Sequence, residues 1–214
     1  MARSLGSQSF VGWCLLRNCI ASTLVMTCSI AASALAETQA ELESGIVQTT
    51  EALRTQPGNA LAYSARGYCY LGLKKLDEAE KDLLKAVSLD QKNKDNYLQL
   101  ACLYSLRKQY EKALSNVRTA MKFGSQSMNT FDMELAYLSS SGRARECLKR
   151  CDEVLEKFPE DSNAFYFRAM SKQELGIGND KDILSDFTAA IRLDPTAEGK
   201  KRDLEFFLSR IKAK

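Results

Sequence analysis

The sequence repeats itself at a spacing of 34 residues, and this periodicity limits the fold more than any other feature of the chain. In the clearest copy, Gly67 and Tyr70 lie on one face of a predicted helix. A second amphipathic helix follows, in which Ala79, Leu83 and Ala86 have i, i+4, i+7 spacing. Small residues allow two helices to approach closely, and larger side chains fill the remaining space. Each copy is therefore predicted to be a helical hairpin that needs a neighbouring copy to cover its remaining apolar face.

The same residue types recur downstream. One step of 34 residues leads from these five positions to Ala101, Tyr104, Ala113, Val117 and Ala120. A second step leads to a weaker copy, which lacks the small and the aromatic residue, with Leu135, Leu138, Cys147, Cys151 and Val154. Pro57 and Pro159 also share a phase, because they lie three periods apart. These agreements indicate one structural unit that is repeated along the chain.

The pattern of a small residue, an aromatic residue, then alanine, a bulky apolar residue and alanine, closed by a proline, resembles the tetratricopeptide repeat. The resemblance implies an all-α fold, an α-solenoid (superhelix) of stacked antiparallel helical hairpins. We expect four repeats, at 60–93, 94–127, 128–161 and 162–196. The fourth contains a two-residue insertion in its inner turn. Two capping segments complete the predicted stack, a half-repeat at 37–57 and a helix at 197–214.

The first 36 residues contain no Asp or Glu, and their second half is uncharged. They end in Ala34-Leu35-Ala36, which has the small-x-small form that a signal peptidase accepts. We therefore predict a signal peptide at 1–36, cleavage before Glu37, and export to a periplasmic or extracellular space.

Three alternatives to this signal peptide stay open. Residues 19–35 could form an uncleaved membrane anchor, because the uncharged stretch is close to spanning length. A lipoprotein signal needs a small residue before Cys28, where the chain has Thr27. An organelle transit peptide usually holds more arginines than Arg3 and Arg17. Contact with a membrane is expected only from the anchor.

The charge of the chain argues against nucleic acid as a partner. The sequence has 30 basic and 27 acidic residues, and removal of the predicted signal peptide leaves a net charge of +1. Charges of both signs alternate along the predicted helix faces, whereas nucleic-acid binders cluster Lys and Arg beside aromatic residues. The C-terminal end is mildly basic, but cations are favoured at the end of a last helix.

The residue types that carry most enzyme chemistry are scarce. The chain has no histidine, which removes the commonest general base and a frequent metal ligand. Cys147 and Cys151 share one helix face, but they have the phase of the core residues Ala79 and Leu83, so we expect both thiols to be buried. We therefore predict no enzyme, no cofactor and no metal site. The alternative is a thiol-dependent accessory subunit that uses Cys102 or Cys151.

The expected function is that of a non-catalytic scaffold or adaptor, which binds a segment of a partner protein. In the family that the sequence resembles, the concave groove is lined mainly by the first helix of each hairpin. Those positions hold mainly apolar residues here: Leu61, Ser64, Tyr68, Leu71, Leu98, Cys102, Ser105, Leu106, Asn129, Asp132, Ala136, Tyr166, Met170 and Gln173. Asn129 and Asp132 are expected to bond the backbone or a basic residue of the partner.

The family's chaperone-tail binders hold a terminal carboxylate with basic residues, which are absent from the matching positions of this chain. Two alternatives to a peptide groove remain. The protein could assemble with further copies of itself, or an extra helix such as the C-terminal cap could cover the groove residues.

Overall fold

The computed structural model describes the backbone of residues 30–212 and the side chains of residues 39–212. This part of the chain consists of ten α-helices and contains no β-strand. The helices are α2 (Ile30–Thr55), α3 (Ala60–Gly72), α4 (Leu76–Leu89), α5 (Lys94–Leu106), α6 (Tyr110–Lys122), α7 (Met128–Ser140), α8 (Ala144–Lys157), α9 (Ser162–Leu175), α10 (Asp180–Leu193) and α11 (Glu198–Lys212). The prediction of stacked antiparallel helical hairpins is confirmed.

The predicted signal peptide lies mostly outside the described residues. The first helix that the structure describes, α2, begins at Ile30 and not at Glu37, so it runs through the predicted cleavage point. Cleavage and export stay predictions. Within residues 30–212, no helix has both the length and the hydropathy needed to cross a bilayer.

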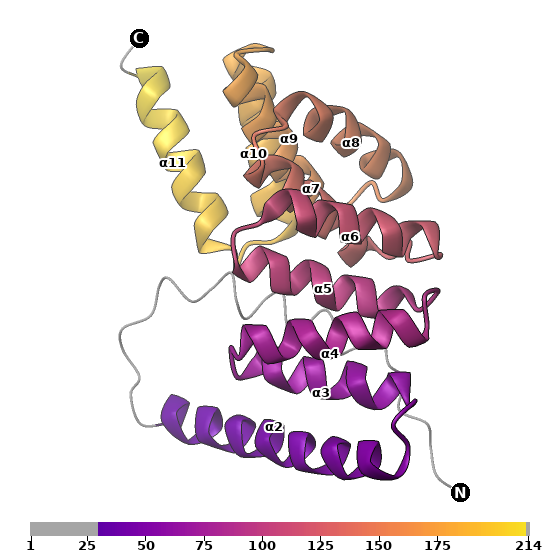
Figure 1. Ribbon diagram of the computed structural model, residues 1–214. Coiled ribbons are helices and arrows are strands. Elements are labelled where there is room, and N and C mark those ends of the chain that lie inside the picture. The colour runs from indigo at the N-terminus through magenta and orange to yellow at the C-terminus, as the bar shows by residue number, and fades with distance from the viewer. Residues whose placement is uncertain (1–29, 213–214) are drawn as a thin grey trace, which may run out of the picture. The chain divides into compact units, whose positions relative to one another are not determined.

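The described part of the chain divides into two compact units, which we call unit 1 (up to Leu106) and unit 2 (from Arg107). In unit 1, α2 packs on α3, α3 and α4 form a hairpin, and α5 lies on α4 (Figure 1). In unit 2, α6 packs on α7, two hairpins follow (α7 with α8, then α9 with α10), and α11 packs on α10. The boundary falls between the two helices of the second predicted repeat.

The helix starts follow from local capping. The Asn59 side chain accepts a hydrogen bond from the amide of Ala62 at the start of α3, and Asn179 does the same for Asp182 in α10. A side-chain oxygen at this place satisfies one of the amides that the first turn of a helix leaves unbonded. These asparagines therefore help to fix where their helices begin.

The inner turn of every repeat contains a residue in the left-handed backbone region. These residues lie 34 positions apart: Lys74 (φ 58°), Lys108 (φ 59°), Gly142 (φ 71°) and Gly176 (φ 64°). A side chain is disfavoured in this conformation, whereas glycine adopts it without steric cost. The two lysines therefore hold a strained backbone that the later repeats avoid.

The repeated small residues form the contact between the two helices of a hairpin. Ala79, Leu83 and Ala86 are fully buried, as their phase predicts. A Cβ atom on Gly67 would lie 2.9 Å from a methyl carbon of Leu83, so only glycine fits without a shift. Tyr70 is only half-buried, unlike its equivalent Tyr104, so it fills less of the hairpin interior than the pattern suggests.

Unit 2 uses the same positions with larger residues. Cys147 and Cys151 are fully buried, as expected of core thiols. In the last hairpin, Phe187 replaces Leu83 in phase and lies 5.7 Å from Phe207 of α11, measured between ring centroids. Through this aromatic pair, α11 packs on the hairpin of α9 and α10.

We predict that Lys74→Gly raises the free energy of unfolding by about 1 kcal/mol, because glycine removes the left-handed backbone strain. Urea unfolding followed by circular dichroism measures the change. Lys75→Gly is the matched control, since Lys75 has a negative φ of −82° and glycine gains nothing there. Equal effects of the two changes would contradict the account of the inner turn.

Candidate functional site

The predicted groove residues of unit 1 separate into exposed and buried ones. Leu61 is 72% exposed on α3. Ser64, Leu71 and Leu98 are buried, so the expectation that they line a surface is wrong. The Ser64 hydroxyl accepts a hydrogen bond of 3.1 Å from Gln99 of α5, which places this position between two first helices. The other four predicted residues are half-buried: Tyr68, Cys102, Ser105 and Leu106.

In unit 2, the C-terminal helix covers part of the predicted groove. The Tyr166 hydroxyl donates a 2.6 Å hydrogen bond to Asp203 of α11. Tyr166 and Met170 also pack against the apolar side of that helix. The alternative that the cap covers groove residues therefore holds for these two. Asn129 is exposed, and Ala136 and Gln173 are half-buried.

Asp132 bonds inside unit 2 instead of offering its carboxylate to a partner. Its Oδ2 accepts a 2.9 Å hydrogen bond from the side-chain amide of Asn163, which links α7 to α9. The carboxyl of Asp161 lies beside it and accepts bonds from the first amides of α9. Burial and this neighbouring carboxyl raise the pKa of Asp132 to about 7. A proton held by the pair allows one carboxyl to bond the other.

Lys200 of α11 is the cation nearest to this acidic pair. Its Nζ donates a 2.6 Å hydrogen bond to the hydroxyl of Ser162 and lies 3.5 Å from Asp194. Burial lowers the pKa of Lys200, while its three acidic neighbours oppose that effect. The contacts tie α11 to the start of α9, so this cluster is a joint between helices.

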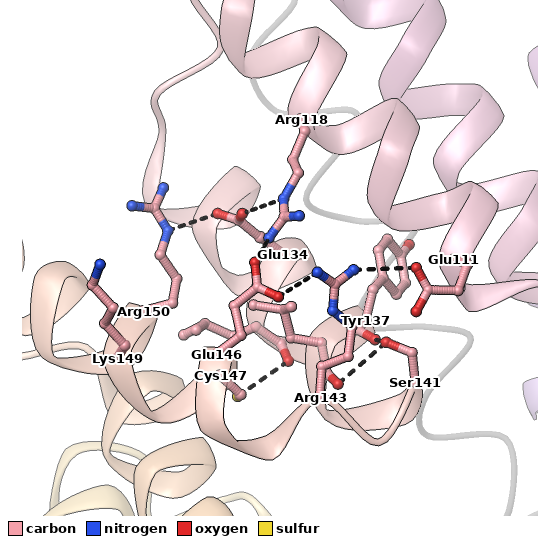
Figure 2. Close-up of polar contacts among 12 residues, drawn as sticks. Glu111, Arg118, Glu134, Tyr137, Ser141, Arg143, Glu146, Cys147, Lys149 and Arg150 are labelled. Carbon is pink, nitrogen blue, oxygen red and sulfur yellow. Dashed lines mark hydrogen bonds and ion pairs between the residues drawn. The ribbon is translucent and has the colours of Figure 1, made fainter.

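The most extensive charged network lies on α6, α7 and α8. Figure 2 shows Glu134 between two guanidinium groups. Its side chain is only 5% exposed and accepts bonds from Nε of Arg118 (3.0 Å) and of Arg150 (2.7 Å). Arg118 also contacts Glu146, and Arg150 bonds Glu153 at 2.6 Å. A buried carboxylate between two cations joins three consecutive helices.

The same positions carry related triads in other repeats, and the signs of the charges alternate. In unit 1, Arg66 of α3 bonds Asp82 of α4 through two nitrogens (2.7 and 2.9 Å) and also bonds the hydroxyl of Thr50 of α2 (3.1 Å). The triad at α9 places Arg168 between two aspartates, Asp152 at 3.0 Å and Asp186 at 2.6 Å. We call these three-residue sets the charge ladder.

Sequence reasoning missed the charge ladder, although a signal for it exists. The central residues Arg66, Glu134 and Arg168 share one phase of the 34-residue period. Their partners lie 16 residues before and 16 residues after, or 18 after where the two-residue insertion intervenes. Residues of opposite charge at these separations are therefore the signal by which the charge ladder could have been predicted.

An open hollow of about 410 Å³ lies over the ladder of unit 2. Its lining residues are Arg118, Met121, Lys122, Glu134, Glu146, Lys149, Arg150 and Glu153. Both guanidinium groups are already ion-paired to glutamates. The hollow is therefore a polar surface feature whose charges mainly stabilise the helix packing.

The two thiols of α8, Cys147 and Cys151, are placed poorly for chemistry. The neighbouring Cys147 thiol and burial raise the pKa of Cys151, so the thiolate that would react is disfavoured. Cys147 is fully buried and donates to the carbonyl of Leu135 at 3.7 Å. Across the described part of the chain, no group of three or more His, Cys, Asp or Glu side chains is arranged to hold a metal ion.

Two models of the tetratricopeptide repeat match the chain, at residues 60–93 and 83–115. The Hsp70-Hsp90 organizing protein of Triticum aestivum is 29% identical over 94 residues, which is 44% of this chain and 16% of the relative. Hsp70-Hsp90 organizing protein 3 of Arabidopsis thaliana is 25% identical over 139 residues, 64% of this chain and 22% of the relative. The chain thus spans a small part of the length of both relatives.

Solved structures share the fold. YrrB, described as a TPR protein with an unusual peptide-binding site, is 19% identical with a TM-score of 0.62, over 77% of this chain and 84% of YrrB. MamA is 14% identical with a TM-score of 0.66, over 80% of this chain and 97% of MamA. At these identities the likeness shows the arrangement of helices alone.

We predict that Glu134→Gln lowers the free energy of unfolding by about 2 kcal/mol, because two guanidinium groups lose a charged, buried acceptor. Chemical unfolding of the full chain measures this. Glu111→Gln is the control, since Glu111 is exposed and pairs with Arg143 at the surface; its loss should stay below about 1 kcal/mol. An unchanged free energy of unfolding in Glu134→Gln would show that the charge ladder does not stabilise unit 2.

The raised pKa of Asp132 predicts a pH dependence of stability. The folded protein holds this proton up to about pH 7, whereas an unfolded aspartate releases it near pH ~4. The contribution of Asp132 to stability is therefore full below that range and is lost as the pH rises to about 7. Urea unfolding at a series of pH values should show a slope that Asp132→Asn removes and the exposed control Asp182→Asn retains. An unchanged slope in Asp132→Asn would contradict this assignment.

Proposed function

We propose that this tetratricopeptide repeat protein is a non-catalytic scaffold, which binds a segment of a partner protein on the faces of its first helices. Proteins with this repeat are typically non-catalytic. The four predicted repeats begin with α3, α5, α7 and α9, which we call the first helices. The proposed binding positions lie on these helices. We call the fully buried positions that join the two helices of a hairpin, such as Ala79 and Leu83, the framework.

One observation carries the proposal. Framework positions such as Ala79, Leu83 and Cys151 have no exposed surface at all. On the first helices, other positions in register with each other keep access to solvent, including Leu61 at 72% and the exposed Asn129. An exposed leucine is not needed for folding, and apolar surface on a repeat face is typical of partner binding.

The relatives support binding of a protein or peptide. The two curated relatives are named for organising Hsp70 and Hsp90, and one similar structure is described as having a peptide-binding site. The buried Ser64, Leu71 and Leu98 narrow the proposed surface in unit 1 to Leu61 and its half-buried neighbours. In unit 2 the corresponding residues are Asn129, Ala136 and Gln173.

The test compares substitutions on first and second helices. Leu61→Glu places an acid in the first turn of α3, where the helix dipole favours it, and Ala136→Arg adds bulk on α7. Leu84→Glu is the matched control, because Leu84 is 49% exposed on the second helix α4. Each variant of the full chain is used to capture its partner from the native cells, and helicity and melting temperature are recorded.

We expect the variant carrying both Leu61→Glu and Ala136→Arg to lose capture, while its melting temperature stays that of the parent. Leu84→Glu should capture normally. A Tyr166→Ser change is unsuited to this test. The Tyr166 hydroxyl donates a hydrogen bond to Asp203, so the change would weaken the packing of α11. Capture that survives the double change but fails with Leu84→Glu would refute the first-helix surface.

A further inference from the structure

The C-terminal helix α11 has two opposite faces of different character. One face packs on α9 and α10 through Leu204, Phe207 and Ile211. The other carries Arg202, Phe206 and Arg210 at i, i+4 and i+8, so they form one stripe along the helix. All three are exposed, and Phe206 keeps 62% of its surface. This stripe, called the α11 stripe below, has no packing role in unit 2.

The repeat period places the stripe in register with the binding positions of the first helices. Steps of 34 residues connect Tyr68, Cys102, Ala136 and Met170, and the two-residue insertion extends the next step to Phe206. In this register α11 has the phase of a first helix, and Phe206 stands where the earlier repeats have their groove residue. The sequence predicted only a capping helix at 197–214, so Phe206 was not among the expected groove residues.

The charges around Phe206 select the kind of partner. Among the described residues, neither Arg202 nor Arg210 forms an ion pair. Two of the three acids on α11 are engaged, since Asp203 accepts from Tyr166 and Glu198 pairs with Lys201 at 2.7 Å. The third acid, Glu205, is exposed three residues after Arg202, and it forms no ion pair among the described residues. The stripe thus offers one aromatic ring between two unpaired cations.

We propose that the α11 stripe binds an acidic segment of a partner protein, with an apolar side chain on Phe206 and a carboxylate on each arginine. This inference rests on the proposed scaffold function and names the chemistry of the bound segment. Eight residues of helix separate the arginines by about 12 Å, and an extended chain covers about 3.3 Å per residue. The matching segment therefore has two acids roughly four residues apart, with the apolar residue midway.

A lipid surface fits the stripe less well than a protein segment. Amphipathic helices that lie on membranes bury a broad apolar face, whereas the apolar face of α11 is occupied by α9 and α10. A single exposed ring between two arginines provides little area to bury in lipid. Arginine is also the residue best suited to bond a carboxylate through two nitrogens.

The direct test is binding of a synthetic peptide to the full chain. The probe is a fluorescein-labelled peptide with the core Glu-Ser-Leu-Ser-Glu, and its control has lysine in place of both glutamates. Fluorescence anisotropy should show binding of the acidic peptide alone, and rising salt should weaken it. Phe206→Ser and the double change Arg202→Glu with Arg210→Glu should each weaken binding about tenfold or more.

Arg145→Glu is the matched control for the charge reversals. Arg145 is exposed in the first turn of α8, where glutamate is favoured, so this change should leave peptide binding unaltered. Circular dichroism of each variant checks that the fold persists. Equal binding of the lysine peptide, or unchanged binding by Phe206→Ser, would overturn the proposal. Binding to phosphatidylserine vesicles with no binding to the acidic peptide would do so as well.

The outcome is separable from that of the proposed function. One result is that the variant with Leu61→Glu and Ala136→Arg loses partner capture, while the parent chain does not bind the acidic peptide. It would contradict binding at the α11 stripe and support the scaffold function. The opposite result is peptide binding that depends on Phe206 and Arg202, together with normal partner capture by the variant with Leu61→Glu and Ala136→Arg. It would support binding at the α11 stripe and contradict binding at the first helices.

Discussion

The close approach of two helices at fully buried small residues is the interaction on which the hairpin of α3 and α4 depends, and the later hairpins bury larger apolar residues at the same positions. Gly67 lies against Leu83 with no room for a Cβ atom, and Ala79 and Ala86 are completely enclosed. Helices that meet this closely gain packing contacts over their whole length. The charge ladder adds specific bonds between consecutive helices, because its central residue contacts the helix before and the helix after it. Together, these contacts leave little of the framework available for binding.

The fold could be predicted from the sequence because its determinants are local and periodic. The helices α3, α5, α7 and α9 begin at the first residues of the four predicted repeats. The exposure of individual side chains was harder to predict, because it depends on contacts with neighbouring helices that the 34-residue period does not determine. Ser64 and Tyr166 share a phase, yet Ser64 is buried beside Gln99 and Tyr166 is covered by α11. The charge ladder is not evident from the repeat pattern, because its phase carries residues of opposite charge, whereas the repeat is defined by similar residue types.

The division between framework and surface explains how such a chain serves as a scaffold. The buried positions that join the helices of a hairpin stay apolar from repeat to repeat, although unit 2 fills them with larger residues. The hairpins therefore keep their packing while the other positions vary. The positions in register on the first helices hold tyrosine, cysteine, alanine, methionine and, on α11, phenylalanine. Under the proposed function, variation at these positions would change what is bound without changing the hairpins. Asp132 shows the opposite case, since a residue expected at the surface became part of a joint between α7 and α9.

The central claim is that partners contact the first helices and the α11 stripe. Photo-cross-linking in the native cells tests it most directly, with a benzophenone amino acid placed in turn at Ala136, Phe206, Leu84 and Arg145. The account predicts that the first two positions cross-link one common partner and that the last two, on α4 and α8, do not. Adducts formed mainly at Leu84 and Arg145 would contradict it and assign binding to the second helices.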